Sequence, residues 1–304
     1  MDKLKQRLEG HLKEIVCDRD PYLNTAGYFF VQQYIREQLA EYGEVEIHEF
    51  QVRGKTHQNL ILNLPGNPFP KPSPGRRGES NSPFPRREGG WGVRFAPILI
   101  GAHYDAVPGS PGADDNGTGV AVLLELAREF DTKPLNYPVR IVAFDMEEYG
   151  LLGSEEYAAY LKQKGESLRL MLSLEMLGYC DSSPHSQAYP PGLKYFYPNC
   201  GNFIAFVGNL STIPDLISLS GNMRKTGTPS QLLPVLNRGL IAPQTRLSDR
   251  SPFWDRGYRA MMVTDTAFLR NPHYHQNSDR IETLDLDFLT GVCRGLIQGL
   301  RRLR

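Results

Sequence analysis

The chain has 304 residues, which is enough for one large α/β domain or two small ones. Hydrophobic residues make up 40% of it and charged residues 22%, as in ordinary soluble globular proteins, and 34 basic residues balance 34 acidic ones. Nucleic-acid binders carry an excess of basic residues, and so do proteins that charge alone holds on anionic lipid. Because this chain has no such excess, we expect neither a nucleic acid nor a lipid surface as its partner.

Two amphipathic helices are predicted at the N-terminus, over residues 3–16 and 25–42, because apolar residues recur there at helical spacing. Charged residues interrupt the first helix so often that it lacks the apolar segment of a signal peptide. No apolar run in the chain approaches the roughly 18 residues that a membrane-spanning helix needs. We therefore expect a cytoplasmic protein without a membrane span.

Two strands are predicted next, over residues 45–52 and 59–66, where apolar residues alternate or run continuously. The following segment, residues 66–92, is rich in Pro and Gly. Such a composition buries too little apolar surface to fold by itself. We expect residues 66–92 to form a long surface loop.

Strands and helices then alternate regularly. Strands are predicted over residues 97–105, 139–148, 168–177, 203–208 and 259–266, and helices over residues 119–130, 151–164 and 284–303. This alternation predicts an α/β fold with a mostly parallel, mixed central sheet and helices on both faces. Ligands of such sheets bind outside the carboxyl ends of the strands. We expect one domain over residues 1–304, with a loop insertion at residues 178–202 near the site.

The four cysteines, Cys17, Cys180, Cys200 and Cys293, lie far apart and show no CxxC spacing. This spacing argues against a disulfide framework and against a cysteine-type zinc site. Pairing of Cys180 with Cys200, which flank one loop-rich segment, stays open.

Polar residues of the kind that bind metals follow several of the predicted elements. His103 ends a strand, and Asp105, two residues later, leaves the chain on the same side, where its carboxylate can fix the imidazole tautomer. A surface pair is the alternative. Asp114 and Asp115 precede the helix over residues 119–130, whose N-terminus favours negative charge. An ordinary helix cap is the alternative there.

Further candidates follow the next elements. Glu147 and Glu148 end the strand over residues 139–148, where one can bind a metal while the other acts as a general base; a solvated loop is the alternative. Glu175 is a lone acid in an apolar strand and needs a partner if it is buried. His273 or His275, in a late polar loop, is a further possible ligand.

Taken together, these residues amount to two histidines and three or four carboxylates at the ends of different elements. Mixed nitrogen and oxygen ligation suits zinc, with water in an open position. A carboxylate that bridges two metals is the usual arrangement of two-metal hydrolases.

The ordered sequence blocks resemble the co-catalytic zinc aminopeptidases of the aminopeptidase Y type, a family that includes glutamate carboxypeptidase and the single-zinc glutaminyl cyclases. The blocks that carry the resemblance are AHYDAVPGSPGADDNGTGVAVLLELA, VRIVAFDMEEYGLLGSEEYA, LSLEMLGYC, SDRSPFWDRGYRAMMVTDTAF and NPHYHQNSDRIETLD. They occur in order between about residues 97 and 290. The resemblance implies a phosphorylase/hydrolase-like zinc exopeptidase fold, two zinc ions per chain and a peptide substrate.

The resemblance also implies a role for each matching residue. The zinc ligands would be His103, Asp115, Glu148, Glu175 and His275, with Asp115 bridging the two ions. The catalytic residues would be Glu147, Asp105 and Tyr274. Glu147 would take a proton from the attacking water and pass it to the leaving amine, Asp105 would orient His103, and Tyr274 would steady the tetrahedral intermediate.

Two departures from the family pattern stand out. Glu175 occupies a position where most members have Asp, and it keeps the acid chemistry that a zinc ligand needs. Arg250 stands where the family often has His, so we expect altered substrate contacts rather than altered metal binding. The sequence therefore favours a zinc-dependent exopeptidase of the aminopeptidase type. The alternatives are a glutaminyl-peptide cyclotransferase with one zinc and a non-catalytic binding homologue; the oligomeric state is left open.

Overall fold

The computed structural model describes residues 2–67, 95–190, 192–236, 239 and 243–303. Its helices are α1 (Lys3–Ile15), α2 (Thr25–Ala40), α3 (Gly119–Thr132), α4 (Leu152–Gln163), α5 (Ile213–Lys225), α6 (Arg250–Asp255) and α7 (Leu286–Leu300). Its strands are β1 (Val45–Val52), β2 (Lys55–Leu64), β3 (Ile98–His103), β4 (Val139–Phe144), β5 (Leu170–Glu175), β6 (Ile204–Asn209), β7 (Ser230–Val235) and β8 (Ala260–Thr264).

The eight strands form one sheet in the order β1-β2-β4-β3-β5-β8-β6-β7. Its centre, from β4 through β3 and β5 to β8, is parallel. The β1–β2 hairpin is antiparallel to β4 on one side, and β6 is antiparallel to β8 on the other. The predicted mostly parallel, mixed sheet is confirmed.

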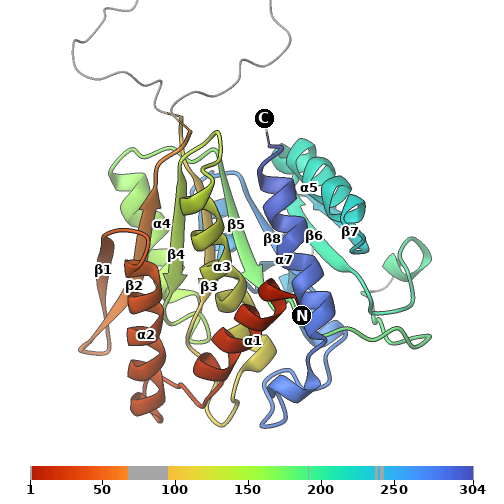
Figure 1. The fold of residues 1–304 in the computed structure, drawn as a ribbon, viewed down its shortest axis with the longest axis horizontal. Coiled ribbons are helices and arrows are strands. Elements are labelled where there is room, and N and C mark those ends of the chain that lie inside the picture. The colour runs from red at the N-terminus through yellow and green to blue at the C-terminus, as the bar shows by residue number, and fades with distance from the viewer. Residues whose placement is uncertain (1, 68–94, 191, 237–238, 240–242, 304) are drawn as a thin grey trace, which may run out of the picture.

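Helices cover both faces of this sheet, as predicted. Along β3, Ile98 and Ile100 pack into the core beneath α1, α2, α3 and α7, whereas Leu99 packs into a second core on the opposite face with residues of α4 and α6. Figure 1 shows α1, α2, α3 and α7 together in front of the sheet. Because successive side chains of β3 enter opposite cores, the strand reads as a continuous apolar run.

Three elements were not predicted. In α5 the buried face includes the polar residues Ser220 and Asn222, so its apolar period is weak. The edge strand β7 contains Pro234, which usually argues against a strand and is tolerated at an edge. Helix α6 has only six residues. The predicted loop over residues 66–92 lies outside the described residues except for its first two positions.

The described residues contain no helix that is both long and apolar enough to cross a bilayer. All four cysteines carry free thiols, so Cys180 and Cys200 are not joined in this structure.

The parallel strands bring their carboxyl ends to one edge of the sheet. β3 ends at His103, β4 ends at Phe144 just before Asp145, and β5 ends at Glu175. Between β3 and α3 the chain forms a short turn, Ala113–Thr118, whose residues are all buried. Polar side chains from separate parts of the sequence therefore converge at this edge.

A buried ion pair attaches α1 to α3. Glu125 is 2% exposed and accepts hydrogen bonds of 2.8 to 2.9 Å from Arg7. His11 lies 3.4 Å from the same carboxylate. We expect Arg7→Ala to lower the free energy of unfolding by about 1–3 kcal/mol at neutral pH, because it leaves a buried carboxylate under-satisfied. Urea denaturation measures this loss.

The pH dependence of this loss follows from the pKa of Glu125. Burial opposes ionisation, but the hydrogen bonds from His11 and Arg7 outweigh it and lower the pKa below its usual 4.5. A lowered carboxyl pKa stabilises the fold above the unfolded value, and this contribution is lost as the pH falls through the folded value. The difference between wild type and Arg7→Ala should therefore shrink below pH 4.5. Lys13→Ala removes an exposed pair with Glu9 and should change stability little.

Candidate metal centre

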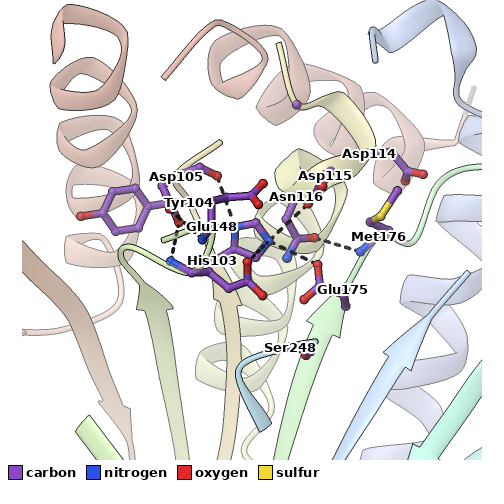
Figure 2. Close-up of polar contacts among 12 residues, drawn as sticks. His103, Tyr104, Asp105, Asp114, Asp115, Asn116, Glu148, Glu175, Met176 and Ser248 are labelled. Atoms are coloured by element: carbon purple, nitrogen blue, oxygen red, sulfur yellow. Dashed lines mark hydrogen bonds and ion pairs between the residues drawn. The ribbon is translucent and has the colours of Figure 1, made fainter. Parts of the chain in front are cut away.

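His103 lies at the middle of the cluster, 1% exposed. Its Nε2 atom lies 3.2 Å from Glu175 Oε1, 3.3 Å from Asp115 Oδ1 and 3.9 Å from Glu147 Oε2. Figure 2 shows the imidazole surrounded by carboxylates from β5, from the turn before α3 and from the loop after β4. Three acids that are far apart in the sequence thus face one ring nitrogen.

His275 forms a second group on the other side of Asp115. Its Nε2 atom lies 3.1 Å from Asp115 Oδ2 and 3.2 Å from Glu148 Oε2. The two oxygens of Asp115 therefore face different histidines, His103 through Oδ1 and His275 through Oδ2. This arrangement gives two sets of nitrogen and oxygen atoms that share one carboxylate.

Asp105 holds two parts of the cluster in place. Its Oδ1 atom lies 3.5 Å from His103 Nδ1, on the far side of the ring from the other acids. The same carboxylate accepts the backbone N–H groups of Glu147 at 3.1 Å and Glu148 at 3.2 Å. One buried side chain thereby fixes both the imidazole and the loop that carries the two glutamates.

Asp279 supports the turn that carries Asp115. It accepts the backbone N–H groups of Asp114 at 2.9 Å and Asp115 at 3.0 Å. Asp114 itself points away from the histidines and accepts hydrogen bonds from Gly178 N and Asn271 Nδ2. The peptide bond between Asp115 and Asn116 is cis. Asp279 and Asn271 had no predicted role, because neither residue has a spacing that marks it.

Burial dominates the ionisation of the cluster. It raises the pKa of Glu147 well above its usual value, although the charge of His103 opposes the shift. Burial and the charge of Asp115 raise the pKa of Glu148 to about 7. Burial would lower the pKa of His275, but its contacts with Asp115 and Glu148 outweigh this and raise that pKa to about 10. The acids therefore compete for too few positive partners.

The donor set fits divalent zinc. Five carboxylates, those of Asp105, Asp115, Glu147, Glu148 and Glu175, face only two imidazoles, and buried negative charge in such excess needs a further cation. Glu148 Oε1 and Glu175 Oε2 are buried and have no hydrogen-bond partner among the described residues. His103, Asp115 and Glu148 offer atoms within 4.8 Å of one another, as do His103, Glu147 and Glu175. Imidazole nitrogens and carboxylate oxygens are typical zinc ligands.

The remaining predicted residues divide into those near the cluster and those outside it. Tyr274 stacks on His275 with ring centroids 3.8 Å apart and faces the adjoining cavity. His273 instead bonds Ser278 Oγ at 2.9 Å and does not join the cluster, so the open choice between the two histidines falls on His275.

We expected Arg250 to alter substrate contacts, and the structure gives it no direct place at the cavity surface. The side chain is fully buried and does not line the cavity. Its guanidinium lies 4.7 Å from the ring centroid of Trp254 and donates to the sulfur of Met262. Arg250 therefore packs behind the cavity wall rather than at its surface.

A cavity of about 510 Å³ opens from the cluster. Glu147, Glu148 and Glu175 face it at one end. The rest of its wall is largely apolar. It includes Phe203, just before β6, and side chains of β6, β7 and β8 such as Ala205, Val207, Leu233, Val235 and Met262. Residues of the segment over 178–202 and of the loop over 266–269 also line it. Beyond the acids and His275 of the cluster, the described lining residues carry no charge. A polar centre thus adjoins an apolar chamber.

The profile of peptidase family M28 matches residues 94–298, about two thirds of the chain. This chain belongs to peptidase family M28. The family predicted from the sequence blocks is thereby confirmed. The N-terminal helices and the β1–β2 hairpin lie outside the matched range.

Two relatives are similar over much of the chain. Over 213 residues it is 37% identical to the uncharacterized protein YfbL of Escherichia coli (strain K12), a match that covers 66% of this chain and 65% of YfbL. Over 210 residues it is 30% identical to leucine aminopeptidase 1 of Trichophyton equinum, which covers 63% of this chain and 50% of the relative. The chain thus spans less than two thirds of the length of either relative.

Solved structures share the fold at low identity. The Legionella pneumophila LapA aminopeptidase has a TM-score of 0.67 and 16% identity, over 98% of this chain and 68% of LapA. The Tannerella forsythia glutaminyl cyclase has a TM-score of 0.65 and 17% identity, over 99% of each chain. The α/β fold predicted for an M28 protein is therefore shared with an aminopeptidase and with a cyclase.

Proposed function

We propose that the chain is a zinc-dependent aminopeptidase, which hydrolyses N-terminal residues from peptides. The observation that carries the proposal is the sharing of Asp115 between two histidine-containing groups at the end of an apolar cavity. Membership of family M28 and the similarity to a leucine aminopeptidase support it.

We assign two zinc sites to the cluster. His103, Asp115 and Glu175 would hold one ion, and Asp115, Glu148 and His275 the other. Zinc bound there would polarise the scissile carbonyl and make an attacking water more acidic. The sharing of Asp115 supports two ions rather than one.

Glu147 is the proposed general base. It faces the cavity, its Oε2 atom lies 3.9 Å from His103 Nε2, and it has no role in the two ligand sets assigned above. Its carboxylate would take the proton of the attacking water and pass it to the nitrogen of the leaving amine. Asp105 supports this role, because its carboxylate accepts the Glu147 N–H and so fixes the loop that carries the base.

Tyr274 is the proposed donor to the oxygen that becomes negative during attack. It lines the cavity beside His275. Burial raises the pKa of its hydroxyl, so the group keeps its proton and can donate it in a hydrogen bond.

The cavity supports a preference for apolar N-terminal residues. An acidic or basic side chain entering it would find no opposite charge among the described lining residues outside the cluster, and burying an unpaired charge is costly. The acids of the cluster would instead pair with the α-ammonium group of the substrate. We therefore expect kcat/KM for leucyl p-nitroanilide to exceed that for glutamyl p-nitroanilide by at least about 100-fold.

Val207→Asp tests this preference, because Val207 is 4% exposed on β6 and faces the cavity. A buried charge there should lower kcat/KM for the leucyl substrate about 100-fold. Asn209→Asp adds the same charge at the end of β6 outside the cavity lining and should leave kcat/KM nearly unchanged. Equal losses in both variants would contradict the assignment of the chamber to the substrate side chain.

A glutaminyl-peptide cyclotransferase is the second candidate, because the structural match to the Tannerella forsythia glutaminyl cyclase covers nearly all of this chain and of the cyclase. The two activities yield different products from a peptide with N-terminal glutamine. An aminopeptidase releases free glutamine, whereas a cyclotransferase releases ammonia and leaves a pyroglutamyl peptide. Incubation of the zinc-loaded chain with free and N-acetylated peptides, followed by mass spectrometry, tests the proposal. Cleavage of the free peptides alone supports it, and ammonia release without cleavage contradicts it.

A further inference from the structure

Arg19, in the segment between α1 and α2, is fully buried at some distance in sequence from the metal cluster. Among the described residues its guanidinium hydrogen-bonds only backbone carbonyl oxygens. The acceptors are those of Tyr104 at 2.8 Å, Pro111 at 2.6 Å, Gly112 at 2.9 Å, Cys17 at 3.2 Å, and Ile15 and Asp115 at 3.4 Å each. A buried guanidinium that donates to carbonyl oxygens of residues 15–17 and 104–115 holds these two chain segments together in one arrangement.

These carbonyls belong largely to the loop that carries the centre. Tyr104 lies between His103 and Asp105, and the loop continues through Gly112 to Asp115. Gly112 has a φ of +62°, and a Cβ atom there would lie 2.7 Å from Arg19 Nη2. The loop thus approaches the guanidinium as closely as a residue without a side chain allows.

Asp115 is held from both sides of its backbone. Its N–H group donates to Asp279 at 3.0 Å, and its carbonyl accepts from Arg19 at 3.4 Å. Between these supports its two carboxylate oxygens face His103 and His275. A shift of this peptide would move the one side chain that both groups share.

We propose that Arg19 is a positioning residue that sets the place of Asp115 and thereby the zinc affinity of the centre. The inference rests on the proposed zinc site. Arg19 lies outside residues 94–298, so the N-terminal segment, which the family profile does not cover, contributes to the centre. A lysine cannot replace it, because an ammonium group has three donors where the planar guanidinium has five in a fixed fork.

Arg19→Lys in the full chain tests the proposal, with zinc titrated into the chelator-stripped protein by calorimetry. Loss of outer support for metal ligands typically weakens affinity about 10- to 100-fold, and we expect a loss in this range. At saturating zinc the KM for leucyl p-nitroanilide should stay within about twofold of wild type, and kcat should recover as zinc is raised. This zinc-dependent recovery separates positioning of the centre from general loss of fold.

Arg7→Lys is the matched control, because Arg7 lies on α1 and pairs with the buried Glu125, which is not a residue of the centre. It should leave zinc affinity unchanged. Wild-type affinity in a folded Arg19→Lys variant would overturn the proposal for Arg19 alone, whereas absence of zinc binding by the wild type would overturn the proposed function as well.

Arg19→Gln provides a second variant, because it removes the guanidinium and leaves Gly112 and Asp115 unchanged. Weakened zinc binding by this variant supports the proposal. If neither Arg19→Lys nor Arg19→Gln folds with or without zinc, Arg19 serves the fold as a whole, and the proposal is overturned.

Discussion

Glu147→Gln is expected to keep its zinc and to lose turnover by about 10²- to 10⁴-fold, the usual contribution of a general base. The substitution preserves the size of the side chain and its backbone contact with Asp105, which comes from the Glu147 N–H. It removes only the ability to accept and release a proton. Because the proposed ligand sets do not include Glu147, zinc content measured by mass spectrometry should match wild type.

Glu156→Gln is the control for this variant. It makes the same chemical change at a residue that is exposed on α4 and lies outside the cavity. Its kcat should equal that of wild type. If Glu147→Gln kept its turnover, the proton acceptor would have to be another group. If it lost zinc together with activity, Glu147 would be a ligand rather than a base.

The sequence predicted which side chains meet best where a polar residue interrupts or ends a buried strand. His103 and Glu175 are such residues, since each closes an apolar strand in the parallel part of the sheet. Parallel strands bring their carboxyl ends together, so residues that end them must meet. In the structure His103 Nε2 and Glu175 Oε1 lie 3.2 Å apart. The parallel arrangement of their two strands is enough to bring them together.

Adjacent residues were harder to separate from local pattern alone. Asp114 and Asp115 both precede α3, and spacing does not say which carboxylate faces the histidines. The backbone at Asp115 departs from helical geometry, with φ of −104° and ψ of 91°, so the two side chains diverge. The resemblance to a known family selected Asp115, and the contacts of the structure agree with that choice.

The supporting residues could not be predicted. Arg19 and Asp279 act through backbone groups of other segments, and backbone groups carry no sequence signature. The sequence also did not predict the apolar wall of the cavity beside the cluster. Its strand β7 contains Pro234, and a single sequence does not reveal that the strand lies at an edge of the sheet.

Removal of zinc by a chelator is expected to abolish activity, and addition of zinc is expected to restore it with a stoichiometry near two per chain. The reason is the place of Asp115, whose two oxygens face His103 and His275 separately. His275→Ala should therefore bind about one zinc, because it disrupts one group, whereas Asp115→Ala should bind little zinc, because it disrupts both. Calorimetry and elemental analysis of the three proteins measure this series.

His273→Ala supplies the control for the series, since His273 lies two residues from His275 but bonds Ser278 instead of the cluster. It should retain both ions and full activity. A wild-type stoichiometry of one would favour the cyclotransferase, and activity that survives exhaustive chelation would remove zinc from the reaction altogether. The series depends on Asp115 because its carboxylate is the only ligand assigned to both ions, so its loss should cost more zinc than the loss of either histidine.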